Sequence, residues 1–148
     1  MSKKLGMEAK LYFDATPLAN GPSGATWTEL TLAKDVTLNL DAGESDVTTR
    51  GNAGWRATRA ALRAGSIEFE LAWDASDTGL EAIRDAYLGG NEIALAAMDG
   101  DVATVGSEGL AGNFVITAFN RGEPLEDAIT VSVTAKPSSK TQWYEVTV

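Results

Sequence analysis

Two short segments in which apolar and polar residues alternate constrain this chain more than any other feature. In residues 35–41 (DVTLNLD), the apolar side chains of Val36, Leu38 and Leu40 fall at every second position. Residues 66–73 (SIEFELAW) alternate in the same way. Successive side chains of a β-strand point to opposite faces, so this period of two predicts a strand with one buried and one polar face. We predict a half-buried strand at each segment.

The stretch between these strands is basic although the chain is acidic. Residues 48–65 (TTRGNAGWRATRAALRAG) hold four of the six arginines, and no acidic residue lies between Asp46 and Glu68, while the formal net charge is -9. If the flanking strands pair antiparallel, residues 42–65 form one long hairpin loop. Loops longer than about 15 residues without regular structure are uncommon unless they are functional or disordered.

Trp55 lies in the middle of this basic stretch, where no alternating pattern would bury it. Tryptophan beside arginine is typical of protein interfaces, where the ring anchors and the guanidinium binds carboxylates. Two interpretations are open: the loop contacts another chain, or it folds back on its own domain with Trp55 filling a gap. The other tryptophans neighbour predicted strands, and we expect them in the core: Trp27, Trp73 and Trp143.

The rest of the chain supplies one helix and several more strands. A helix over about residues 77–89 is predicted, because Ser76 or Asp77 can cap its start and Gly89-Gly90 ends it. Its predicted packing face is Leu80, Ile83 and Tyr87. Further strands are predicted over residues 7–13, 91–98, 112–119, 127–135 and the carboxyl-terminal TQWYEVTV.

This pattern predicts a mainly β fold, a sandwich or barrel of two antiparallel sheets with one flanking helix. A chain of 148 residues fits a single domain, so we expect one domain over residues 1–148 with a flexible polar leader at residues 1–6. No apolar run is long enough to span a membrane, and the amino terminus lacks the apolar segment of a secretory signal.

The composition excludes many kinds of enzyme. Cysteine and histidine are absent, which removes thiolate nucleophiles, imidazole bases and the usual zinc ligands. Glu68 and Glu70 share one strand face, but alternation explains them as a solvated face. Asp99, Asp101 and Glu108 match no calcium-binding loop and are expected in a turn. We therefore expect no catalytic residue, no metal and no cofactor.

The order of these features resembles the tail tube proteins, or major tail proteins, of long-tailed bacteriophages and related particles. The resemblance runs from about Trp27 to Pro137, through DVTLNLD, DVTTRGNAGWRA, SIEFELAWD, a helix ending in AYLGG, and GNFVITAFNRGEPLEDAITVSVTAKP. It implies two antiparallel sheets with one helix, similar to the tube proteins of contractile injection systems and type VI secretion. It also implies hexameric rings that stack into a hollow tube for DNA, with no catalysis.

In such rings the long connection between two inner strands reaches neighbouring subunits. The resemblance therefore implies inter-subunit contacts for Arg50, Trp55, Arg56, Arg59 and Arg63. It gives the polar strand faces a possible place in the channel, with Asn39, Glu68 and Glu70, and with Thr130, Ser132 and Thr134. An outer face in ordinary solvent fits the same alternation.

The implied partners are further copies of this chain and other tail proteins, such as the tape measure and the terminator. DNA is expected to pass without specific binding, and no membrane partner is expected. The implied location is the virion tail, after synthesis in the bacterial cytoplasm.

Two other functions compete with the tube hypothesis. A small β-domain could bind an anionic ligand or carbohydrate through the basic Trp55 loop. A nucleic-acid binder could use the same arginines, but a chain with pI near 4.4 carries a negative charge that repels the phosphate backbone. The ligand-binding hypothesis predicts that replacing Arg56 and Arg59 abolishes binding without changing the oligomeric state.

Overall fold

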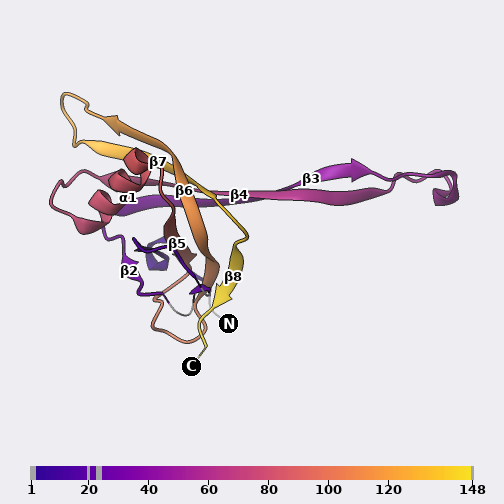
Figure 1. The fold of residues 1–148 in the computed structure, drawn as a ribbon, viewed down its shortest axis with the longest axis horizontal. Coiled ribbons are helices and arrows are strands. Elements are labelled where there is room, and N and C mark those ends of the chain that lie inside the picture. The colour runs from indigo at the N-terminus through magenta and orange to yellow at the C-terminus, as the bar shows by residue number, and fades with distance from the viewer. Residues whose placement is uncertain (1–2, 20, 23–24, 148) are drawn as a thin grey trace.

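The fold is mainly β with one helix, as predicted (Figure 1). The computed structural model describes residues 3–19, 21–22 and 25–147. The elements follow the order η1 (Gly6–Glu8), β1 (Lys10–Asp14), β2 (Thr28–Glu29), β3 (Ala33–Asp46), η3 (Arg50–Asn52), β4 (Thr58–Ala72), α1 (Thr78–Gly89), β5 (Ile93–Met98), β6 (Glu108–Gly122), β7 (Thr130–Pro137) and β8 (Gln142–Glu145).

All strand pairs are antiparallel. The strands follow the order β2-β1-β5-β6-β7-β4-β3, and β8 pairs with the beginning of β6. The long strand β6 connects two halves of the sheet, because its first part pairs with β5 and its second with β7. Side chains from both halves of the sheet and from α1 pack together in one hydrophobic core, which fills the space between the two halves. Among them are Phe13, Phe69, Ile83, Leu95 and Val131.

Helix α1 has the predicted position and ends. The Asp77 carboxylate accepts a hydrogen bond from the backbone N–H of Leu80 at 3.0 Å, which caps the amino end. Gly90 ends the helix in the left-handed conformation with φ 64°. Leu80 and Ile83 are fully buried, whereas Tyr87 is partly exposed and stacks on Phe119 of β6.

The hairpin of β3 and β4 runs far out of the body (Figure 1). β4 pairs with β7 only from Ile67 to Ala72, so nearer the hairpin tip its only sheet neighbour is β3. We call residues 40–65 the arm. The hairpin is confirmed, but most of residues 42–65 are strand, because pairing continues to Asp46 and Thr58. Both faces of the arm lie in solvent, so its apolar residues need not fall at every second position. The alternation of apolar and polar residues therefore stops in the arm although the strands continue.

Other expectations need correction. Val36 and Leu40 are exposed, although Leu38 between them packs against the core. Val36 lies at an irregularity in the pairing of β3, and Leu40 lies beyond Ile67, where the pairing of β4 with β7 ends. Trp27 and Trp73 pack against buried clusters as expected, but the expectation for Trp143 is wrong, since β8 leaves its ring half exposed. The first strand begins at Lys10, after a short 3-10 turn. Of the expected leader, residues 1–2 lie outside the described residues.

Candidate functional site

The arm ends in a turn built from its own hydrogen bonds. The Thr48 hydroxyl accepts from Ala57 N–H at 2.8 Å, and the Asn52 side chain accepts from Thr49 N–H at 2.7 Å. Trp55 N–H donates to the Asn52 carbonyl at 3.0 Å. Gly54 has φ 87°, a conformation that favours glycine and lets the chain turn back. These contacts give the tip, residues 47–57, a defined shape without support from the body.

The tip presents its tryptophan to solvent. Trp55 is 79% exposed. The interpretation in which the loop folds back on its own domain is therefore wrong: the paired strands hold the tip away from the body (Figure 1). A large aromatic side chain that a paired hairpin exposes to solvent is the kind of group that anchors protein interfaces.

The four arginines are unpaired within the described residues. The ion pairs there lie elsewhere, and the strands of the arm carry Asp41, Glu44 and Asp46 beside the arginines without an ion pair between them. The Asp46 carboxylate instead accepts from Thr48 N–H at 2.9 Å, and hydrogen bonding by Thr48 lowers the pKa of Asp46. The predicted contact residues are distributed along the arm: Arg50 in η3, Trp55 and Arg56 after it, and Arg59 and Arg63 on β4.

Asn39, Glu68 and Glu70 share one polar face of the sheet. The Asn39 side-chain amide donates to the Glu68 carboxylate at 3.1 Å. In the strand register Glu68 is opposite Thr134, and Glu70 is opposite Ser132. On β6 Asn120 is opposite Ser132 and extends this face, one residue beyond the strand that the sequence predicts over 112–119. The face therefore spans β3, β4, β7 and β6, and the core lies on the other side.

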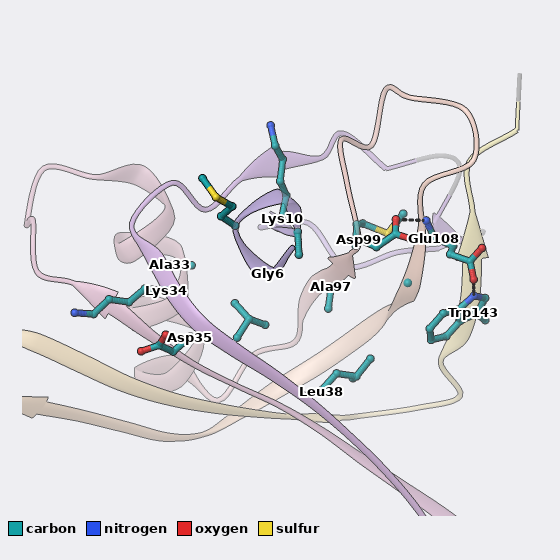
Figure 2. A pocket seen from close by; sticks show the side chains of 15 residues that line it. Gly6, Lys10, Ala33, Lys34, Asp35, Leu38, Ala97, Asp99, Glu108 and Trp143 are labelled. Carbon is teal, nitrogen blue, oxygen red and sulfur yellow. Dashed lines mark hydrogen bonds between the residues drawn. The ribbon is translucent and has the colours of Figure 1, made fainter. Parts of the chain in front are cut away.

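Two open hollows border the base of the arm, and Trp143 contributes to both. The first, shown in Figure 2, has about 820 Å³ and is lined by Lys10, Lys34 and Leu38 among others. The second has about 800 Å³ and lies between the arm and β8. The Trp143 indole N–H donates to the Glu108 carboxylate at 3.1 Å, which fixes the ring between the two. Neither hollow contains Trp55, Arg56 or Arg59, which weighs against ligand binding through the basic loop.

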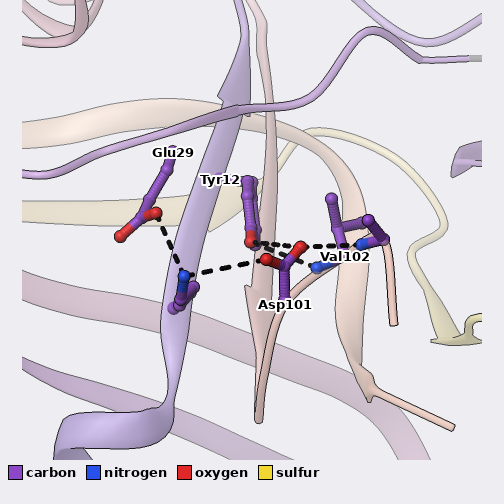
Figure 3. Close-up of polar contacts among 6 residues, drawn as sticks. Tyr12, Glu29, Asp101 and Val102 are labelled. Atoms are coloured by element: carbon purple, nitrogen blue, oxygen red, sulfur yellow. Dashed lines mark hydrogen bonds and ion pairs between the residues drawn. The ribbon is translucent and has the colours of Figure 1, made fainter. Parts of the chain in front are cut away.

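The acidic residues between β5 and β6 organise the turn in which they were expected. Asp99 accepts from Glu108 N–H at 2.9 Å, and Asp101 accepts from Ala103 N–H at 2.8 Å. The Lys10 ammonium lies 3.4 Å from the Glu29 carboxylate and 3.9 Å from that of Asp101. Figure 3 shows both carboxylates. The Glu29 carboxylate raises the pKa of Lys10. Burial raises the pKa of Tyr12, whose hydroxyl accepts from Val102 N–H at 3.1 Å.

The fold and the arm define an antiparallel β protein whose projecting hairpin carries exposed aromatic and cationic groups. Comparison with family models identifies the family: the phage tail tube protein model matches residues 16–142. The chain belongs to the phage tail tube protein family and is a structural subunit of a tail tube.

Solved structures share this fold at low sequence identity. The tail of an empty gene transfer agent (GTA) particle with C6 symmetry superposes with TM-score 0.74 at 15% identity, covering 96% of this chain and 99% of that chain. The virion of the native GTA particle gives 0.75 at 16% identity, with the same coverage. The SPP1 tail tube gives 0.74 at 18% identity, covering 97% of this chain and 80% of that chain.

A comparison with curated proteins gives no match. Within residues 3–19, 21–22 and 25–147, no helix has both the length and the apolar character needed to cross a membrane.

Proposed function

We propose that this chain assembles into rings of six that stack as a hollow tube, through which DNA leaves a phage-like particle. The single observation that carries the proposal is the arm, a paired hairpin that extends from the body and presents exposed Trp55. Tryptophan is among the residues that most often anchor protein interfaces, and the arm places it far from the body, where a neighbouring copy can cover it. The C6 symmetry of the structurally similar GTA tail supports the number six.

The arm is the proposed contact between subunits. Trp55 supplies the apolar anchor, and Arg50, Arg56, Arg59 and Arg63 are available for carboxylates of neighbouring copies. The chain without its arginine stretch is strongly acidic, so each copy offers many such carboxylates. An exposed ion pair contributes only about 0 to 1 kcal/mol, so the stability of the tube depends on apolar contacts and on their repetition.

The polar face of Asn39, Glu68 and Glu70 is the proposed lining of the channel. Carboxylates repel the phosphate backbone, and the amide and hydroxyl groups beside them offer no fixed positive charge. DNA therefore slides past this face without binding. The chain acts by assembly and not by catalysis, and the other proposed partners are tail proteins such as the tape measure and the terminator. Its proposed site of synthesis is the bacterial cytoplasm.

Light scattering over a concentration series tests the proposal. We expect large particles to form above a threshold concentration, or after addition of a tail-tip initiator. Replacing residues 47–57 by a two-residue Asn-Gly turn should abolish the particles and leave the body folded. If the chain remains monomeric with the initiator at high concentration, or if the shortened chain assembles equally well, the proposal is wrong.

A further inference from the structure

The hollow between the arm and β8 is an apolar groove without a cover. Leu40 of the arm is 55% exposed and Trp143 of β8 is 54% exposed, and both residues line the groove. Leu40 is paired with Gly65, whose lack of a side chain leaves room for the leucine, because a Cβ there would lie 3.0 Å from Leu40 Cδ2. In the strand register this arm face continues the face that packs on the core at Leu38 and Ile67.

Positively charged side chains also line the groove. Arg63 and Lys140 line it, against the single carboxylate of Asp41. Neither cation makes an ion pair within the described residues. The groove therefore suits a partner that combines an apolar side chain with carboxylates.

The turn between β6 and β7 has this chemistry. We call residues 123–127 (EPLED) the acidic turn. Leu125 at its centre is 99% exposed. Glu123 is paired with Arg121 at 3.3 Å, while Glu126 and Asp127 have no cation within ion-pair distance in the described part of the chain. One fully exposed leucine thus stands beside two carboxylates without a counter-charge.

The base of the arm and β8, which border the groove, lie at the other end of the body from the acidic turn (Figure 1). The strand register shows why: Ala72, at the end of β4 farthest from the arm, pairs with Thr130, next to the acidic turn. A surface at one end that complements a surface at the other gives a head-to-tail contact, which generates closed rings or open polymers by repetition.

We infer that the acidic turn of one copy docks in the groove of the next. Leu125 then contacts Leu40 and Trp143. The carboxylates of Glu126 and Asp127 face Arg63 and Lys140. The inference rests on the proposed function, since it names the surface that one subunit offers to another. It assigns a contact at the base of the arm, separate from that of the tip at Trp55.

Disulfide trapping tests this contact, because the chain has no cysteine of its own. Leu125→Cys combined with Leu40→Cys should link copies into a ladder of covalent oligomers when assembled tubes are oxidised. A disulfide forms only when the two Cα atoms approach to roughly 4.4–6.8 Å. Leu125→Cys combined with Val105→Cys is the matched control, because Val105 is exposed but lies outside the groove, and we expect no ladder from it.

A charge exchange gives a second readout on the same surfaces. Glu126→Lys with Asp127→Lys should raise the threshold concentration for assembly at least tenfold. Adding Arg63→Glu with Lys140→Glu in the same chain should restore it. Tubes that form without the Leu125–Leu40 ladder, or a threshold that the four changes together do not restore, overturn the contact alone. No assembly of the unaltered chain, even with an initiator, overturns the proposed function and this inference with it.

Discussion

The side-chain amide of Asn39 donates to the Glu68 carboxylate at 3.1 Å, which joins β3 to β4 on the polar face just where the arm leaves the body. The same amide lies 3.4 Å from the Ser66 hydroxyl. Three polar side chains thus form one hydrogen-bonded group on the proposed channel wall. The bond directs the Asn39 amide hydrogens to protein carboxylate oxygen, so fewer of its donors remain for phosphate.

Charge reversal on this face should convert a wall that repels DNA into one that binds it. For Glu68→Lys with Glu70→Lys, we predict tubes that retain DNA at low salt and release it steeply as salt rises, because bound phosphates release counterions. Retention of labelled DNA by pelleted tubes measures the effect. Asp85→Lys with Glu92→Lys makes the same charge change on α1 and the turn after it, and should retain none. Equal retention by both variants would contradict the channel assignment.

Removing the ring at the arm tip should weaken assembly without weakening the fold. For Trp55→Ala we predict a change of no more than about 0.5 kcal/mol in the free energy of unfolding, as for other exposed positions. An interface anchor is worth about 2 kcal/mol or more, which corresponds to roughly a 30-fold higher threshold concentration for assembly. Light scattering and thermal unfolding separate the two effects. Leu88→Ala on α1 is the control, and an equal threshold for both variants would argue against the tip contact.

Gly109 should tolerate no side chain. A Cβ at this position would collide with the carbonyl oxygen of Ala97 on the paired strand β5. Gly109→Ala must separate the strands locally, and we predict a loss of about 1 to 3 kcal/mol in the free energy of unfolding, measured with denaturant. Gly6→Ala, where no atom lies within 4 Å of the added Cβ, is the control. An unchanged midpoint for Gly109→Ala would mean that β5 and β6 do not pair in this register.

The cap of α1 should depend on the acceptor oxygen of Asp77 and not on its charge alone. Asp77→Ala leaves Leu80 N–H without its partner and should destabilise the protein by about 1 kcal/mol. Asp77→Asn keeps a side-chain oxygen and should recover most of that loss. Thermal unfolding of both variants gives the comparison. If the two variants lose equal stability, the helix-dipole effect of the charge outweighs the hydrogen bond.

Acid should remove the contribution of Asp74. Its carboxylate accepts from the Ser76 hydroxyl at 2.7 Å and from Ser76 N–H at 3.0 Å, and these bonds lower its pKa. The unfolded carboxyl has a pKa of about 3.9, so the stabilisation is present above that pH and disappears as the pH falls through the lower folded value. Denaturant unfolding from pH 6 to pH 3 should show the stability difference between the unaltered chain and Asp74→Asn shrinking. A constant difference would contradict this.

The sequence predicted those elements whose residues face a core. The alternation at Ile67, Phe69 and Leu71 and the helical spacing of Leu80 and Ile83 correspond to buried side chains, because burial selects apolar residues at regular positions. The length of the arm could not be predicted from the sequence, because the side chains of the arm are not buried. Where both faces meet solvent, as at Ala60 and Leu62, strand pairing leaves no periodic signature.

The residues of the candidate site could be predicted from the sequence, but the surfaces that they form could not. The cluster of arginines around Trp55 is visible in the sequence, and the place of Asn39 and Glu68 on one face follows once the hairpin register is known. The groove at Trp143 and the exposure of Leu125 depend on where β8 and the β6–β7 turn end in space. The dipeptide Pro124-Leu125 among acidic residues was the available signal for the latter: an apolar residue in a turn that no strand buries.

Electron microscopy of the purified chain tests whether it assembles into a hollow tube of sixfold rings. Concentrated protein, with a tail-tip initiator added where nucleation is needed, is imaged in negative stain, and end-on views are averaged without imposed symmetry. We predict rings with sixfold symmetry around a hollow centre, and tubes in which the rings repeat along the axis. Fields that contain only separate monomers, or filaments without a central channel, would contradict this prediction.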